Sequence, residues 1–481
     1  MRPSASTKFL LFAVAFAIAV VVYLAVDHLS TPSAPPSTAS ASPRPPASSG
    51  ASSGATSGAA STGAAPTAEP PASTPPAVSD ADVAQLYQAC TSGKFPTTAD
   101  AAARAAACSR ALQTRRLKPD EIAFARLTRG IARTALGDRE LASQDYIEAV
   151  QRYDSLINPA NPDSLALFRR AVALDGAGQT EKALEDYSAA LKADPKASFA
   201  FLGRGVLLAT RQRAYNRAIQ DFDKVLVIEP DNVEALIARG DAFSQLGNTG
   251  RALADLNRAV ALAPNDATAY LARGLAESRR GNRTAAVQDY EEALKRDPRR
   301  VDALVNIAAL QLLENKAEAA VKTLDRAIAI DPTSALAFYN RGLAHFSLRA
   351  YDKAIADYGK AIELDPRMGL AYNNLGLAKA IAGNDLKGAL ADNDQAVKLL
   401  PLNLEVCDTR GFIFLKMGEP AKALSAYNAA LDIDPNRALS LYGRGLAKIR
   451  MGDVAAGRGD QAAATTINPE VADDFAIYGL K

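Results

Sequence analysis

The hydrophobic pattern of this chain is periodic over most of its length. From Leu127 to the C-terminus, apolar residues recur three and four positions apart, which predicts helices that each bury one stripe. The segment 339–366, YNRGLAHFSLRAYDKAIADYGKAIELDP, indicates two such helices followed by a stop, and loosely rewritten copies recur about every 34 residues. One helical hairpin cannot cover its own apolar stripe, so the pattern predicts a stack of hairpins.

Three kinds of residue mark each unit. A glycine or alanine in the first helix, and a small residue twelve or thirteen positions later, allow the two helices to approach closely. An aromatic residue or leucine, common four positions further on, is expected to fill the wedge between hairpins. From the second unit on, a proline closes the repeat because it cannot continue the second helix. The first-helix marks are Gly130, Ala171, Gly205, Gly240, Gly274, Ala308, Gly342, Gly376, Gly411 and Gly445.

The 34-residue period and these marks resemble the tetratricopeptide repeat family. The resemblance covers about residues 123–471, in about ten units. It implies an all-α fold, an α-solenoid whose helical hairpins form a right-handed superhelix with the first helix of each pair on the concave face. It also implies a non-enzymatic scaffold that binds a protein or peptide in that concave groove.

The N-terminal region predicts a membrane anchor. Residues 9–26, FLLFAVAFAIAVVVYLAV, are 18 uncharged apolar residues, and as a helix they would span about 27 Å, close to a bilayer core. Arg2 and Lys8 precede the segment and the next basic residue is Arg44, so we expect residues 1–8 in the cytoplasm and the remainder outside. A cleaved signal peptide is the alternative, although the first Ala-x-Ala, at residues 39–41, lies far downstream.

Residues 27–79 predict a disordered linker rich in Pro, Ala and Ser, in which Arg44 and Glu69 are the only charges from residue 31 to 78. The whole organisation resembles the membrane-tethered periplasmic repeat proteins of proteobacteria. That resemblance implies a single-pass inner-membrane protein with its array in the periplasm. If the apolar segment is cleaved, the protein would be periplasmic or secreted.

Both ends of the array depart from the repeat. Residues 80–117 predict a divergent helical hairpin with Cys90 and Cys108 on its two helices, and in an exported protein these are expected to form a disulfide. Two free buried thiols are the alternative. Residues 469–481 predict a helix that caps the last repeat, with Asn468 as N-cap and Val471, Phe475 and Tyr478 in one apolar stripe.

Composition and charge narrow the function further. The 55 Lys and Arg residues nearly balance 53 Asp and Glu residues, so the net charge of +2 does not favour nucleic acid as a partner. The two histidines, His28 and His345, are far apart in sequence, which leaves little material for a histidine metal site or a catalytic triad. With no phosphate loop or nucleophile elbow in the sequence, we expect no enzyme activity, cofactor, metal or small-molecule substrate.

Three consecutive units carry an asparagine two residues before the small first-helix mark: Asn306, Asn340 and Asn374. Stacking should place them in register on the concave face, where side-chain amides, each a donor and an acceptor, could hold a peptide backbone. Tyr339 and Asn373, three residues before the mark, are expected beside them. The alternative is that the asparagines only solvate the groove and that the neighbouring apolar residues only pack.

An arginine before the mark and an aspartate fifteen or sixteen residues after it recur together in seven units. We interpret them as structural pairs within hairpins, with anion binding by a row of arginines as the alternative. The sequence thus predicts a membrane-tethered scaffold for a protein or peptide partner in the cell envelope. A self-associating structural component of an envelope complex is the alternative function.

Overall fold

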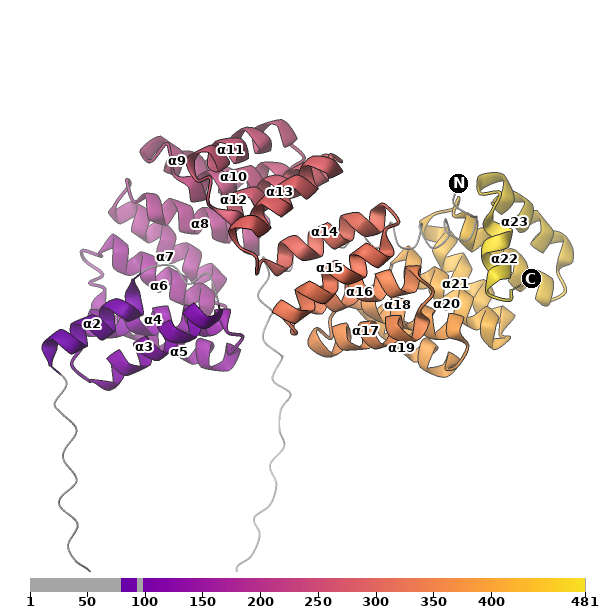
Figure 1. Cartoon of the computed structure of the whole chain (residues 1–481), viewed down its shortest axis with the longest axis horizontal. Coiled ribbons are helices and arrows are strands. Elements are labelled where there is room, and N and C mark those ends of the chain that lie inside the picture. Colours follow the sequence, from indigo (N-terminus) through magenta and orange to yellow (C-terminus); the bar gives the residue numbers. More distant parts are fainter. Residues whose placement is uncertain (1–78, 93–97, 481) are drawn as a thin grey trace, which may run out of the picture. The chain divides into compact units, whose positions relative to one another are not determined.

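The computed structural model describes residues 79–92 and 98–480. The predicted N-terminus (residues 1–8), anchor (9–26) and linker (27–79) lie outside the described residues, except for Ser79, which is the N-cap of the first described helix. Within the described ranges, none of the helices combines the length and apolar content needed to cross a membrane. Every regular element in these ranges is a helix, and successive helices form antiparallel pairs (Figure 1).

The described residues up to Gln212 and those from Arg213 onward form two compact units, and each is considered by itself. The first contains α2 (Asp80–Thr91), α3 (Thr98–Gln113), α4 (Pro119–Ala135), α5 (Arg139–Leu156), α6 (Ser164–Gly176), α7 (Thr180–Ala193) and α8 (Ser198–Arg211).

The second unit is longer and contains most of the regular repeats. Its helices are α9 (Tyr215–Ile228), α10 (Val233–Gln245), α11 (Thr249–Leu262), α12 (Ala267–Arg279), α13 (Arg283–Arg296), α14 (Val301–Leu313), α15 (Ala317–Ile330), α16 (Ala335–Ser347), α17 (Tyr351–Leu364), α18 (Gly369–Ala382), α19 (Leu386–Leu399), α20 (Leu404–Met417), α21 (Pro420–Ile433), α22 (Ala438–Arg450), α23 (Val454–Ile467) and α24 (Val471–Ile477).

Local sequence fixes where these helices begin and end. At the start of α10, the Asn232 side chain accepts a hydrogen bond from the backbone N–H of Ala235 at 2.9 Å and so caps the helix. Beyond its end, Gly247 adopts a left-handed φ of 74° that strains other residues. The second helix of this pair, α11, ends at Leu262, two residues before Pro264. The predicted alternation of two helices and a stop is therefore confirmed.

The first-helix glycines are needed because an aromatic ring lies directly against them. A Cβ atom on Gly342 would lie 2.7 Å from the ring of Tyr358, and a Cβ on Gly274 would lie 2.7 Å from the ring of Tyr290. Both rings are almost completely buried. Glycine and aromatic residue thus form one packing unit between the two helices of a hairpin.

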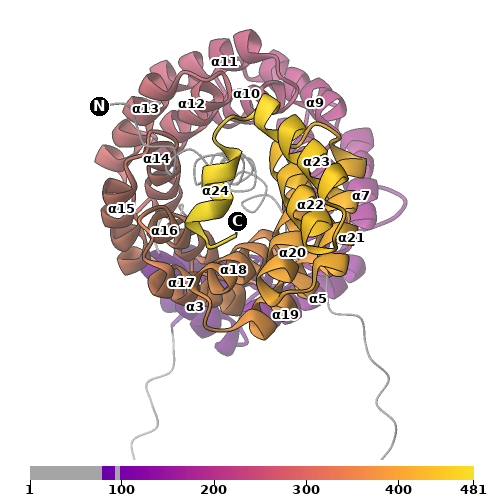
Figure 2. The same ribbon diagram turned by 90° about the vertical axis from the view of Figure 1, so that its right-hand side faces the viewer.

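Within the second unit, the two helices of each hairpin lie on different sides. Figure 2 shows α10, α12, α14, α16, α18, α20 and α22 on the inner side and α11, α13, α15, α17, α19 and α21 on the outer side. The first helix of each of these pairs therefore lines the concave face, as the resemblance implied.

Recurring arginines connect the two helices of a hairpin and also connect that hairpin to the preceding one. Arg239 donates through Nε and Nη2 to both carboxylate oxygens of Asp255, sixteen residues later, each at 2.7 Å. Its Nη1 donates to Asp223, sixteen residues earlier, at 2.6 Å. The hydrogen bond to Asp255 raises the pKa of Arg239 above its ordinary value. One guanidinium thus holds three helices together.

This arrangement repeats along the chain. The pairs within a hairpin are Arg129–Asp145, Arg170–Asp186, Arg239–Asp255, Arg273–Asp289, Arg341–Asp357 and Arg444–Asp460. The Nη1 bonds to the preceding hairpin are Arg170–Asp154, Arg204–Ser188, Arg239–Asp223, Arg273–Asn257, Arg341–Asp325, Arg410–Asp394 and Arg444–Asn428. The prediction of structural pairs within hairpins is confirmed for these six of the seven repeats, whereas the contact with the preceding hairpin was not predicted.

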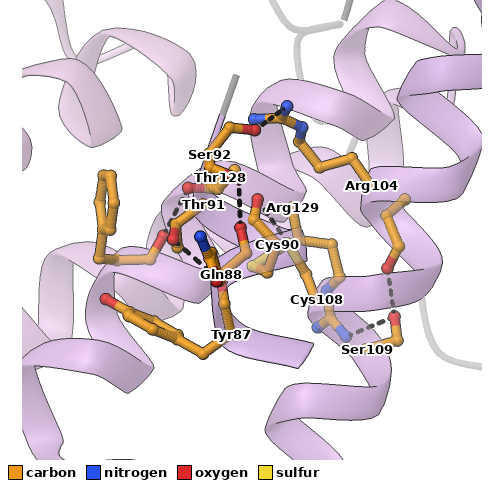
Figure 3. The surroundings of a disulfide bond; sticks show 12 residues. Tyr87, Gln88, Cys90, Thr91, Ser92, Arg104, Cys108, Ser109, Thr128 and Arg129 are labelled. Atoms are coloured by element: carbon orange, nitrogen blue, oxygen red, sulfur yellow. Dashed lines mark hydrogen bonds between the residues drawn. A yellow bond between two sulfur atoms is a disulfide. The ribbon is translucent and has the colours of Figure 1, made fainter. Parts of the chain in front are cut away.

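The terminal hairpin α2–α3 is joined by a disulfide between Cys90 and Cys108 (Figure 3). Both residues are buried, and Val83 and Ala111 belong to the same small apolar cluster. Arg129 of α4 donates to the Ser109 hydroxyl of α3 at 3.1 Å. The hairpin is thus held by its own covalent link and by the first regular repeat.

Candidate peptide-binding face

The predicted asparagine row lies on three consecutive inner helices. Asn306 belongs to α14, Asn340 to α16 and Asn374 to α18, 34 residues apart in each step. Each precedes by two residues the small residue that contacts the second helix of the same hairpin. The repeat therefore gives all three the same place in their hairpins, and the helices that carry them lie on the inner side of the second unit (Figure 2).

Two of these asparagines are buried, and their side-chain amides are not fully hydrogen-bonded. Asn306 is 3% exposed and Asn340 is 0% exposed. The Oδ1 of Asn306 and both polar atoms of Asn340 have no hydrogen-bond partner within residues 79–92 and 98–480. A buried polar atom without a partner costs about 1–3 kcal/mol of stability. These amides therefore have hydrogen-bonding capacity that the described fold leaves unused.

The third asparagine belongs to a hydrogen-bonded network. Asn374 Nδ2 donates to the Tyr339 hydroxyl at 3.1 Å, and Asn373 Nδ2 donates to Asn374 Oδ1 at 3.4 Å. Tyr339 is almost completely buried, and this burial raises the pKa of its phenol above the ordinary value. The structure thus brings Tyr339, Asn373 and Asn374 together. Among the described residues, neither polar atom of Asn340 nor the Oδ1 of Asn306 takes part in this network.

The network continues to a residue that the sequence analysis did not single out. Asn393 of α19 donates to Asn373 Oδ1 at 3.4 Å and to the carbonyl oxygen of Val406 at 3.1 Å. Its own Oδ1 accepts from Arg410 Nη1 at 3.3 Å. Asn393 thereby links α18, α19 and α20, and every polar atom of its fully buried side chain has a partner.

A sequence signal for Asn393 was present. Four residues after the second small mark, eight repeats carry an aromatic residue or leucine, whereas the repeat that contains Gly376 carries Asn393. An amide at a position that otherwise requires a large apolar side chain predicts a buried polar cluster.

A second polar cluster joins the next two inner helices. Asp408 of α20 accepts from Arg437 Nε at 3.0 Å and from the hydroxyl of Ser440 on α22. Burial raises the pKa of the Asp408 carboxyl, and the charge of Arg437 opposes that rise. No feature of the repeat pattern predicted this cluster, because it depends on which residues face one another across two hairpins.

Chemically, this face offers amides, hydroxyls and apolar side chains. Uncharged hydrogen-bond donors and acceptors of this kind can bind the backbone of a peptide. In the part of the chain that the structure describes, no three His, Cys, Asp or Glu residues come close enough to hold a metal ion.

Comparisons with known proteins agree with the repeat pattern. Family models described as tetratricopeptide repeat match residues 127–198, 168–233, 207–273, 271–335, 335–368 and 404–437, which together exceed half of the chain. The small glutamine-rich tetratricopeptide repeat-containing protein 2 of Mycosarcoma maydis is 32% identical over 99 residues. That match spans 20% of this chain and only 28% of the length of the relative.

The chain is also partly similar to several solved structures. The structure of the APC/C hetero-tetramer Cut9-Hcn1 has a TM-score of 0.49 at 17% identity, over 83% of this chain and 87% of the other. A tetratricopeptide repeat protein from Parabacteroides merdae has a TM-score of 0.42 at 21% identity, over 54% of this chain and 98% of the other. Tetratricopeptide repeat proteins are generally non-enzymatic scaffolds that bind protein or peptide partners. The matches to the family models show that this chain belongs to the tetratricopeptide repeat family.

Proposed function

We propose that this chain is an exported, membrane-tethered scaffold whose concave face binds a segment of a partner protein in the cell envelope. The apolar residues 9–26 would anchor it in the bacterial inner membrane with residues 1–8 in the cytoplasm. The linker would hold the array in the periplasm, where a disulfide such as Cys90–Cys108 is stable. The tether would fix the location, and the array would supply the binding surface.

The observation that carries this proposal is the unused hydrogen-bonding capacity of Asn306 and Asn340. Both occupy the same repeat position as Asn374, on neighbouring inner helices. An amide buried without partners destabilises the free protein, so its presence at a repeated position favours a role outside folding. A bound segment that supplies a donor and an acceptor to each amide would remove that cost.

The binding would depend on the backbone of the partner more than on its side chains. Each asparagine can donate through Nδ2 and accept through Oδ1, which matches one peptide unit of an extended chain. Tyr339 and Asn373 would hold Asn374 in orientation, because they hydrogen-bond to it. Small rotations of the Asn306 and Asn340 side chains would be required to reach such a partner, since both are closed to solvent in the free chain.

The test is affinity capture from an envelope extract with the full chain as bait. The Asn306→Ala, Asn340→Ala, Asn374→Ala variant should lose a partner that the parent captures. The matched control replaces three exposed asparagines outside the inner helices, Asn216, Asn265 and Asn436, by alanine and should keep the partner. A partner retained equally by all three chains would exclude the asparagine row as the binding site, and light scattering would show whether the chain captures only itself.

A further inference from the structure

The last helix lies on the concave side of the second unit. Helix α24 packs against α22 and α23 on the inner side of the second unit (Figure 2). Its aromatic side chains contact residues of α20 and α22. The helix begins at Val471, two residues later than the sequence predicted, because Asn468 accepts from the backbone N–H of Glu470 and shapes a turn instead. This turn directs the chain back over the array.

Aromatic contacts dominate the interface. The ring centroid of Phe475 lies 5.1 Å from that of Tyr442 on α22 and 6.5 Å from that of Phe412 on α20. Tyr478 meets Phe412 edge-on at 5.9 Å. Tyr442 precedes Gly445 by three residues and so occupies the repeat position of Tyr339, and Phe412 directly follows the first-helix mark Gly411.

A lysine recognises the C-terminal end of the helix. Lys416 Nζ of α20 donates to the backbone carbonyl oxygen of Tyr478 at 3.0 Å. A cation at this place satisfies a terminal carbonyl and complements the negative end of the helix dipole. Beyond it, Tyr478 also interacts with Tyr351, the first residue of α17. The C-terminal segment therefore extends over several repeats.

Burial divides the segment into an inner and an outer face. Val471, Phe475, Tyr478 and Leu480 are buried, whereas Ile477 is 41% exposed. A helix of seven residues is not stable alone in water, so α24 depends on the surface that it covers. These features are those of a ligand helix in a groove rather than of an independent element.

We propose that residues 471–480 are an internal, replaceable ligand of the concave face, and that the surface formed by Phe412, Lys416 and Tyr442 binds a short amphipathic helix of a partner in the same way. The partner helix would present two aromatic side chains three residues apart and end where Lys416 meets its carbonyl groups. This inference rests on the proposed function for the identity of the binding face and adds the chemistry of the partner.

Tethering explains how the internal helix keeps the site closed. A segment joined by a short turn has an effective concentration in the millimolar range at its own site. An external helix with the same contacts would have to exceed that concentration, or bind more tightly, to replace α24. Weakening α24 should therefore open the site to an external copy.

The experiment uses the full chain and a fluorescent peptide of residues 469–481, with binding measured by anisotropy. The Phe475→Ala, Tyr478→Ala chain should bind the peptide at least ten-fold more tightly than the unmodified chain does. The matched control is Ile477→Ala, which changes an exposed apolar residue of the same helix and should leave the site closed. A peptide with Phe475→Ala should lose at least ten-fold in affinity for the opened chain.

A second measurement does not depend on the folding of the double variant. The chain contains no tryptophan, so Phe475→Trp in the full chain gives a single fluorophore at the interface. Its emission should be blue-shifted and should move to longer wavelength when excess peptide displaces α24. Equal peptide binding by the unmodified and opened chains, or a tryptophan that is solvent-exposed from the start, would refute the inference.

The two proposals can fail separately. Peptide exchange that persists in the Asn306→Ala, Asn340→Ala, Asn374→Ala variant, together with unchanged partner capture, would refute the asparagine row and retain the helix site. Partner capture that requires the asparagines, together with a failed peptide exchange, would refute only the inference about α24.

Discussion

Asn393 donates its side-chain amide to Asn373 at the place where another repeat inserts the ring of Tyr358 behind Gly342. Gly376 is the equivalent glycine in this repeat, and no ring lies against it. A Cβ atom on Gly376 would instead lie 2.7 Å from the backbone carbonyl oxygen of Ala389. One repeat of the array has thus exchanged an apolar wedge for a hydrogen-bonded one.

Replacement of Asn393 by alanine should destabilise the second unit by about 1–3 kcal/mol, because it leaves Asn373 Oδ1 and the Val406 carbonyl without their donor. Urea unfolding followed by circular dichroism measures this change. Asn216→Ala on the exposed side of α9 is the matched control and should change stability by less than about 0.5 kcal/mol. Equal effects of the two substitutions would argue against the network.

Replacement of Asn340 by leucine should have the opposite effect on the stability of the chain. The side chain is fully buried and its amide has no partner among the described residues, so an apolar side chain of similar size removes an uncompensated polar group. We expect unchanged or higher stability, by up to about 1 kcal/mol, together with weaker partner capture. A marked loss of stability would show that the amide is satisfied in the free protein.

The features that could be predicted from the sequence are those that depend on residues within a single hairpin. Paired helices, the close approach at Gly342 and the pairing of Arg239 with Asp255 all follow from residues at fixed separations within one repeat. The bond from Arg239 to Asp223 did not follow, because it depends on how one hairpin stacks on the preceding one.

The candidate site was predictable to a similar extent. The repeat register alone gave the row of Asn306, Asn340 and Asn374, but their different surroundings depend on neighbouring hairpins. The apolar stripe of α24 was likewise evident in the sequence. The surface that it covers was not, because a stripe with Phe475 and Tyr478 can pack against any apolar face of suitable width.

Replacement of Arg239 by lysine should destabilise the chain by about 1.5–3 kcal/mol, although the charge is kept. A lysine cannot reproduce the two-pronged contact with Asp255 and the third bond to Asp223 at once. Arg258→Lys, at an exposed pair with Asp231, is the control and should be nearly neutral. Thermal unfolding of both variants distinguishes a structural clamp from a row of arginines with little structural effect.

Removal of the disulfide should affect one end of the array. Cys90→Ser, Cys108→Ser opens a loop of 18 residues, which corresponds to roughly 3 kcal/mol. Because repeats interact mainly with their neighbours, amide hydrogen exchange should accelerate in α2 and α3 and remain unchanged in α14–α18. Cys407→Ser, at the cysteine outside the disulfide, should leave exchange in α2 and α3 as it is.

The docking of α24 should depend on pH through Asp474. This residue is 2% exposed, and its Oδ1 has no hydrogen-bond partner in residues 79–92 and 98–480. Burial, followed by the charges of Glu470 and Asp473, raises the pKa of its carboxyl from 3.8 to about 7. Lys416 and Tyr442 face the helix from α20 and α22, and burial raises the pKa of the Tyr442 phenol above its ordinary value.

Because the pKa of Asp474 is higher when α24 is docked than when it is free, docking is strongest near pH 4 and weakens as the pH rises to about 7. The emission of the Phe475→Trp chain should therefore shift to longer wavelength from pH 5 to pH 8. Asp474→Asn should abolish the shift, since the amide stays neutral throughout. Asp473→Asn should keep a shift with a lower midpoint, because Asp473 is exposed and acts only through its charge. A pH response that survives Asp474→Asn would assign the titration to another group.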